Sequence, residues 1–316
     1  MITSTPKAAV GYAHSKLILV GEHAVVYGKP AIAIPFPLGV KSTIEEKTGE
    51  IMIACGHYVG PINRMPVKMQ GIAACIRATL NDLKKPLNGL LIRLHSSIPI
   101  GRGLGSSAAI AIAIVKSLFS FYGQKVSQKE LMALVEIGEI YAHGNPSGID
   151  MAAASSELPI WFKNGKEILP LNVGSPLSIV VADSGRIGNT HTAVKKVREK
   201  FLLEPEKIQR PLERIERITR EANGALADGN AYLLGRLLNL NHAELITLGV
   251  SDDGLNRLVE AARSAGGLGA KLTGSGLGGC VIALAPNLEH AKVIAGALMK
   301  AGANKTWYFS TDSRFC

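Results

Sequence analysis

A glycine-rich segment, PIGRGLGSSAAIAIA at residues 99–113, carries the groups best suited to chemistry. Glycines at 101, 103 and 105 let the backbone turn its N–H groups inward, at φ values that other residues avoid. A helix expected from about Ser106 to Tyr122 adds its unpaired first-turn amides and the positive end of its dipole. Together these groups predict a binding site for phosphate oxygens.

Two serines and two alanines follow the last glycine of this segment. Ser106 and Ser107 place hydroxyl groups at the start of the expected helix, where one can ligate a metal ion and the other can hydrogen-bond a phosphate. Ala108 and Ala109 let the helix approach its neighbours closely. Taken alone, the segment also fits a tight strand-to-helix turn with a serine as the helix N-cap.

Two other phosphate-binding loops fit this segment poorly. A Walker A loop ends in Gly-Lys-Ser/Thr, and no lysine stands at that place. Gly103-x-Gly105-x-x-Ala108 matches the Rossmann pattern loosely, but that pattern needs an acidic residue about 20 positions further on to bind a ribose. The corresponding segment, FYGQKVS, has none. The sequence therefore disfavours a nicotinamide-dependent enzyme.

Two carboxylates follow, on either side of an Asn-Pro-Ser-Gly turn. Ser127-x-x-Glu130 is a capping box that opens a helix carrying Glu139. Asp150 follows the turn, so the two side chains could converge on one cleft. One carboxylate suits a divalent cation carried by a triphosphate, and the other suits a substrate hydroxyl. Asp150 could equally be the N-cap of the MAAASS segment.

Three polar residues flank a short apolar strand near the N-terminus. Lys16 precedes the strand expected at 17–20, and Glu22 and His23 stand beyond its far end. A charged residue beside a buried strand is often merely exposed, and a lone histidine is often packed in a core, so both alternatives stay open here.

The remaining elements indicate an α+β protein with two domains that meet near residue 174. Further strands are expected at 31–34 (ended by Pro35 and Pro37), 90–98 and 178–182. Charged helices are expected across 194–221, and a second glycine-rich loop lies between short strands in 269–285. The predicted domains are therefore 1–174 and 175–316.

Composition limits the function classes. The 316 residues are 47% hydrophobic, which excludes a disordered chain, and the four cysteines lack metal-site or disulfide spacing, which fits a reducing, cytoplasmic location. No signal peptide is recognisable, and the longest apolar run, 108–115, is too short for a membrane span.

The net charge of +10 is compatible with a nucleic-acid-binding module, which is a rival hypothesis. However, acids and bases interleave across 194–221. That pattern is typical of solvated helix faces with i,i+4 ion pairs, not of a basic stripe, so no nucleic-acid partner is expected.

Four motifs, in order along nearly the whole chain, resemble the GHMP kinases. PIGRGLGSSAA resembles the Pro-x-x-x-Gly-Leu-Gly-Ser-Ser-Ala-Ala signature of that family, and KLTGSGLGGC (271–280) matches its C-terminal motif. KLILVGEHAVVYGKPAIA (16–33) and HGNPSGID (143–150) are similar to the mevalonate kinase branch, and the chain length resembles that of its shorter bacterial members. Another GHMP kinase with a different acceptor is the nearest alternative.

The resemblance implies the GHMP kinase fold: an N-terminal domain like domain 2 of ribosomal protein S5 and a C-terminal ferredoxin-like domain, with the active site between them. It also implies mevalonate and MgATP as substrates. Its members are often homodimers, although the sequence does not fix the oligomeric state, and no membrane partner is expected.

The resemblance further implies roles for individual residues. The ATP phosphates would be bound by two loops, through Gly101, Gly103, Leu104, Gly105, Ser106, Ser107, Ala108, Gly274, Ser275 and Gly276. Ser107 and Glu139 would ligate Mg²⁺.

The acceptor side would be formed by residues from other motifs. Asp150 would take the proton of the mevalonate hydroxyl, and Lys16 would stabilise negative charge beside it. Glu22, His23 and Thr190 would line the mevalonate pocket. One departure is visible: Ala13-His14-Ser15 stands where the family commonly has Ala-Pro-Gly, which affects the expected backbone path before Lys16.

Overall fold

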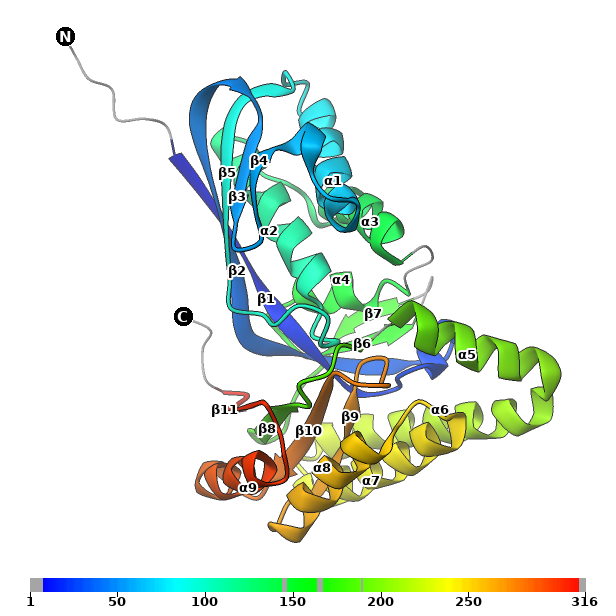
Figure 1. The fold of residues 1–316 in the computed structure, drawn as a ribbon. Helices are drawn as coiled ribbons and strands as arrows, with labels where there is room; N and C mark the ends of the chain where they lie inside the picture. The colour runs from blue at the N-terminus through cyan, green and yellow to red at the C-terminus, as the bar shows by residue number, and fades with distance from the viewer. Residues whose placement is uncertain (1–7, 144–146, 164–166, 189, 313–316) are drawn as a thin grey trace. The chain divides into compact units, whose positions relative to one another are not determined.

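The chain forms two compact units in a computed structural model that describes residues 8–143, 147–163, 167–188 and 190–312 (Figure 1). Unit 1 comprises Met1–Ser15, Leu38–Pro99 and Gly105–Ser155. Unit 2 comprises Lys16–Pro37, Ile100–Leu104 and Ser156–Cys316. Strands β1 (Ala8–Val20) and β2 (Ala31–Glu50) each contribute residues to both units.

Unit 1 packs helices on a mixed sheet. Its strands follow the order β4–β3–β5–β2, with β1 also paired to β2, and only the β3–β5 pair is described as parallel. Helix α2 contacts α1, α3, α4 and β5. The elements not yet given are β3 (Met52–Cys55), β4 (Tyr58–Pro61), β5 (Asn88–Ser96), α1 (Gln70–Asp82), α2 (Ser106–Phe121), α3 (Gln128–His143) and α4 (Ile149–Ala154), with short 3₁₀ helices at Ile62–Arg64 and Val67–Met69.

Unit 2 contains a four-stranded antiparallel sheet of order β11–β8–β10–β9. In addition, β6 pairs with the first residues of β2 and β7 pairs with β6. Its elements are β6 (Ile160–Lys163), β7 (Glu167–Pro170), β8 (Ser178–Asp183), β9 (Gly269–Thr273), β10 (Cys280–Ala285), β11 (Lys305–Ser310), α5 (Thr190–Leu203), α6 (Pro205–Ala227), α7 (Ala231–Leu248), α8 (Asp253–Ser264), α9 (Leu288–Lys300) and a 3₁₀ helix at Ala24–Tyr27.

The core of unit 2 lies between this sheet and its helices. Strands β9 and β10 are buried along their whole length, and helices α7, α8 and α9 contact the sheet. Helix α6 adds Ile208, Leu212 and Ile215, whose spacing of three or four residues places them on one face. The hydrophobic effect of this burial, about 25 cal/mol per Å² of apolar surface, is what holds β9 and its following loop in place.

Several elements predicted from the sequence are confirmed. The expected strands at 90–98 and 178–182 are β5 and β8, and the small-residue helix is α2. Both hydrogen bonds of the capping box form: Ser127 N donates to Glu130 Oε2 (2.9 Å) and Glu130 N donates to Ser127 Oγ (3.3 Å).

The prediction that Pro35 and Pro37 end a strand is wrong, because β2 continues to Glu50. Its residues 31–33 pair with β6, and its pairing with β5 begins at Val40. Both prolines therefore lie between these two ladders, where the missing proline N–H removes no hydrogen bond to either strand.

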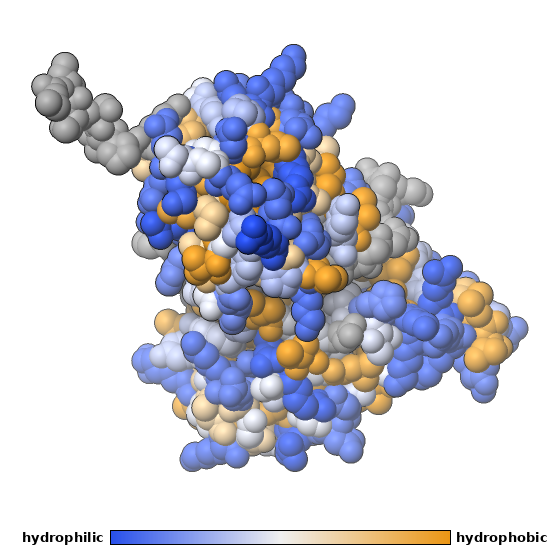
Figure 2. All heavy atoms as spheres, turned by 45° about the horizontal axis from the view of Figure 1, so that its top comes forward, coloured by the Kyte–Doolittle hydropathy of each residue, from blue (hydrophilic) through white to orange (hydrophobic). Residues whose placement is uncertain are grey.

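The surface agrees with the interpretation of the basic charge. Lys195 pairs with Glu199, and Arg220 pairs with Glu216, both at i,i+4 spacing. Figure 2 shows hydrophilic residues over most of the visible face, with hydrophobic residues in small separate patches. Within the described ranges, no helix combines the length and apolarity that crossing a bilayer requires.

Candidate active site

The first glycine loop is held in unit 2 by Lys16. The Lys16 side chain is 1% exposed, and its Nζ donates a hydrogen bond to Gly103 O at 3.0 Å. Its backbone N–H donates to Leu104 O at 3.3 Å. The alternative of an exposed flanking lysine is therefore wrong. The structure places this ammonium group against the backbone of the predicted phosphate loop.

The second glycine loop, residues 274–279, packs against the first. A Cβ atom on Gly274 would lie 3.1 Å from both Cα and O of Gly103, and Gly274 has a φ of +81°. A Cβ on Gly276 would lie 2.0 Å from Val250 O. Only glycine allows this approach, so the two loops predicted to bind phosphate meet backbone to backbone.

An ion pair that the sequence reasoning missed also fixes the first loop. Arg102 Nε lies 2.9 Å from Asp183 Oδ1, and an Arg102 terminal nitrogen donates to Gly185 O at 3.1 Å. Asp183 ends β8, is 2% exposed and also accepts the Gly185 N–H at 2.9 Å. The only sign of this pair in the sequence was a carboxylate, Asp183, at the end of an apolar strand.

The turn after β1 carries Glu22 and His23, which are 1% and 5% exposed. His23 Nε2 lies 2.9 Å from Ser275 O in the second loop, and Thr190 Oγ1 donates to Ser275 Oγ at 3.3 Å. Burial lowers the pKa of His23, and its contact with the Ser275 carbonyl partly offsets that effect. His23 is thus buried, as the core alternative expected, but it bonds to a predicted phosphate loop.

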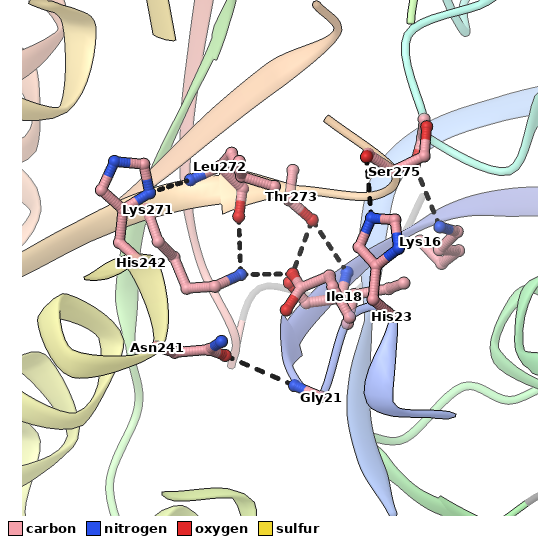
Figure 3. A network of polar contacts seen from close by, with 12 residues as sticks. Lys16, Ile18, Gly21, His23, Asn241, His242, Lys271, Leu272, Thr273 and Ser275 are labelled. Atoms are coloured by element: carbon pink, nitrogen blue, oxygen red, sulfur yellow. Dashed lines mark hydrogen bonds and ion pairs between the residues drawn. The ribbon is translucent and has the colours of Figure 1, made fainter. Parts of the chain in front are cut away.

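Glu22 forms a buried ion pair with Lys271, which the sequence reasoning did not single out (Figure 3). Lys271 Nζ also donates to Leu272 O at 2.6 Å, and neither side chain of the pair is more than 1% exposed. Burial raises the pKa of Glu22 and lowers that of Lys271, while each charge partly offsets the effect on its partner. The signal in the sequence was a lysine inside a short strand whose other residues, Gly-Ala and Leu-Thr, carry no charge.

Further hydrogen bonds in Figure 3 join β9 to β1 and α7. Thr273 Oγ1 accepts from Ile18 N (3.1 Å) and donates to Ile18 O (2.9 Å). His242 Nδ1 accepts from Leu272 N at 3.4 Å. Burial, with the charges of Lys271 and Arg263, lowers the pKa of His242 to about 4, so the ring is neutral at pH 7.

In unit 1, the N-terminus of α2 offers the amides that the sequence predicted. Gly105 is the N-cap, with a left-handed φ of 70°, and makes no side-chain capping bond. The alternative of a serine N-cap is therefore wrong. Ser106 Oγ is buried and has no hydrogen-bond partner among the described residues, while Ser107 is half-buried and Ala108 fully buried. This helix end suits an anionic ligand.

The two predicted carboxylates lie on neighbouring helices of unit 1. Glu139 on α3 is 2% exposed, and α3 packs against both α2 and α4. Asp150 is half-buried in the first turn of α4, whose N-cap is Gly148, so Asp150 is not the N-cap. Part of the turn that joins the helices, residues 144–146, lies outside the described residues.

The donors proposed for Mg²⁺ are few but chemically suitable. No cluster of three or more His, Cys, Asp or Glu side chains capable of holding a metal occurs in the described ranges. Mg²⁺ prefers oxygen ligands and is usually held by one or two protein groups together with substrate phosphates. The Ser107 hydroxyl and the Glu139 carboxylate fit that pattern.

Comparisons with known proteins give the class. Residues 70–157 match the GHMP kinases N terminal domain, and residues 222–304 match the GHMP kinases C terminal model. A mevalonate kinase of Thermococcus onnurineus is 34% identical over 313 residues, covering 92% of each chain. The chain therefore belongs to the GHMP kinase family.

Solved structures agree with this assignment. The L. major mevalonate kinase, solved in complex with R-mevalonate, gives a TM-score of 0.83 at 26% identity over 98% of this chain and 96% of that one. The Methanococcus jannaschii mevalonate kinase gives 0.81 at 28% identity over 98% of both. These matches confirm the predicted GHMP kinase fold.

Proposed function

We propose that this chain is a mevalonate kinase: it transfers the γ-phosphoryl group of ATP to the primary hydroxyl of mevalonate, giving 5-phosphomevalonate and ADP. This is an early step of isopentenyl diphosphate biosynthesis by the mevalonate pathway. The observation that carries the proposal is similarity over almost the whole chain to enzymes of that name, 34% identical over 92% of both chains for one of them. The family matches over residues 70–157 and 222–304 support it.

Phosphate binding is assigned to the two glycine loops and the start of α2. Phosphoryl transfer passes through a loose transition state, so positioning and charge stabilisation dominate catalysis. First-turn amides of α2 and the Ser106 hydroxyl, which is buried without a partner in the described residues, supply neutral donors to phosphate oxygens. Gly274, Ser275 and Gly276 form the second phosphate loop.

Charge stabilisation and proton transfer are assigned to Lys16 and Asp150. The Lys16 ammonium is buried against Gly103 O, which fixes its position at the loop. Asp150 accepts the proton of the mevalonate hydroxyl as that oxygen attacks phosphorus. Glu22, His23 and Thr190 line the acceptor pocket. Their contacts with β9 and Ser275 support the assignment.

Ser107 and Glu139 are the proposed ligands of Mg²⁺. When bound, the ion neutralises phosphate charge and favours departure of ADP. The boundary at residue 174, the cytoplasmic location and a homodimeric state stay predictions.

The proposal is tested by measuring ADP release from MgATP with purified protein and a panel of acceptors. Mevalonate should give turnover, while phosphomevalonate, galactose and homoserine at the same concentration should not. Equal or faster turnover with another acceptor would assign the chain to a different branch of the family.

A further inference from the structure

Lys271 is a fully buried cation on β9, outside the residues assigned to catalysis. It lies between Ala270 and Leu272 in a strand whose five residues are all buried. Its ammonium group donates to Glu22 Oε1 and to Leu272 O. In Figure 3 the Lys271 side chain extends away from β9 toward the turn that follows β1.

Stability alone does not account for this pair. Removing two charges from water carries a desolvation penalty that their mutual attraction often fails to repay, and apolar residues of similar volume hold such places equally well or better. A buried ion pair does impose a defined geometry on the groups that it joins. The pair is therefore better explained by what it orients.

The group that it orients is a strained turn. His23 has a φ of 60°, a conformation that a non-glycine residue keeps only where surrounding contacts hold it. Each residue of the turn has one such contact: Gly21 N donates to Asn241 Oδ1 (3.4 Å), Glu22 pairs with Lys271, and His23 Nε2 lies 2.9 Å from Ser275 O. The contact at Glu22 is an ion pair.

We propose that Lys271 is a positioning residue of the acceptor site: it fixes Glu22, and through Glu22 the turn that sets His23 against Ser275. Lys271 acts through Glu22 and does not touch substrate. The inference rests on the proposed function, which assigns Glu22 and His23 to the acceptor pocket and Ser275 to the phosphate loop.

The charged and titratable groups that face the pair come from three places. Lys16 on β1 acts on both members of the pair, His23 lies in the turn itself, and His242 on α7 faces Lys271. His242 is neutral at pH 7, so a Lys271→Met variant leaves Lys16 as the cation acting on Glu22.

The test compares Lys271→Met with Thr273→Val, a control on the same buried strand. Thr273 bonds to Ile18 but not to the turn, so its loss perturbs β9 without releasing Glu22. For Lys271→Met we expect KM for mevalonate to rise about tenfold or more, with KM for ATP changed less than about twofold. Thr273→Val should keep both KM values.

Two further readouts separate positioning from a general structural role. Hydrogen exchange of the amides at 21–25 should accelerate in Lys271→Met and not in Thr273→Val. The acid limb of kcat/KM for mevalonate should move to higher pH in Lys271→Met, because Glu22 loses its nearer cation and its pKa rises. If Lys271→Met does not fold, Glu22→Gln/Lys271→Met, which removes both charges of the pair, replaces it in the exchange assay alone, because Glu22 itself lines the proposed acceptor pocket.

A KM for mevalonate within twofold of the native value in Lys271→Met would overturn the proposal. Equal exchange at 21–25 in Thr273→Val and in whichever of the two Lys271 variants folds would overturn it as well. Failure of the proposed function would look different. A native protein that does not phosphorylate mevalonate would refute that function, whereas the exchange comparison would still test whether Lys271 holds the turn.

Discussion

The candidate site residues of unit 1 and those of unit 2 are positioned in different ways. In unit 1, the end of α2 that is proposed to bind phosphate is made by consecutive residues, Gly105 to Ala108, and the two carboxylates follow on α3 and α4. In unit 2, the groups come from distant segments and are joined by contacts such as Lys16 to Gly103 and His23 to Ser275.

The comparison distinguishes groups that are proposed to bind ligand from contacts that hold such groups in position. A helix N-terminus presents its amides wherever a helix begins, so the local sequence is almost enough to position the proposed phosphate-binding amides of unit 1. The unit 2 groups depend on side chains from several segments, and the loss of any one should alter the others. Variants of the proposed binding residues in unit 1 should therefore affect single steps. Loss of an ion pair in unit 2 should instead alter the geometry of the loop or turn that the pair holds.

Replacing Asp150 with Asn should have the largest effect and tests unit 1. Loss of the proton acceptor should lower kcat about 10²–10⁴-fold, while the amide keeps the size of the side chain. Steady-state kinetics with saturating mevalonate and MgATP measure this, with the urea unfolding midpoint as the control for folding. Near-native kcat would remove Asp150 from the mechanism.

Replacing Glu139 with Gln, or Ser107 with Ala, should change the response to magnesium. Each removes one proposed oxygen ligand, so the Mg²⁺ concentration for half-maximal rate should rise about tenfold. A magnesium titration at fixed ATP measures the change. An unaltered titration curve in both variants would argue that neither side chain binds the ion.

Replacing Asp183 with Asn tests the support of the first loop in unit 2. Weakening the ion pair with Arg102 should raise KM for ATP by about three- to tenfold, with kcat less affected. Asp252→Asn is the matched control, because Asp252 pairs with Arg186 and not with Arg102, and this pair is more exposed than that of Asp183. Equal KM values for ATP in the two variants would contradict a role in loop positioning.

Replacing His242 with Asn should leave activity near native at pH 7 and change the pH dependence of stability. The His242 pKa is about 4 in the folded chain against 6.5 ordinarily. As pH falls from 6.5 toward 4, the unfolded chain binds a proton at His242 that the folded chain does not, so the free energy of unfolding decreases over this range. The difference amounts to on the order of 3 kcal/mol. Urea unfolding at pH 7 and pH 4.5 should show that the variant loses less free energy of unfolding between these pH values than the native protein does. An equal loss in both proteins would be inconsistent with the depressed pKa.

Much of the fold was predictable because its signals are local. The glycine segment, the capping box at Ser127 and the alternation in β5 each occupy a few consecutive residues, and all formed as expected. The prediction that a strand ends at Pro35 was wrong. Proline interrupts a strand only where a neighbouring strand needs its N–H, and the sequence alone does not show where β2 changes from one pairing partner to the next.

The supporting contacts of the site were not predictable. Lys271 and Glu22 are 249 positions apart, and Arg102 and Asp183 are 81 apart. Residue types indicated that each could ionise, but only the fold decides which buried charges face one another. Lys271 begins the motif at 271–280, whose glycines were interpreted as a phosphate loop. The lysine itself was therefore not considered, and its pairing with Glu22 was missed.

The position of the transferred phosphate tests the central claim most directly. Purified protein, MgATP and R-mevalonate should yield a product whose ³¹P signal is split by the two protons of the methylene carbon that carries the ester oxygen. A phosphate ester on the primary hydroxyl requires this splitting. A phosphate ester without that splitting, which would lie on the tertiary hydroxyl, or release of inorganic phosphate alone, would contradict the account.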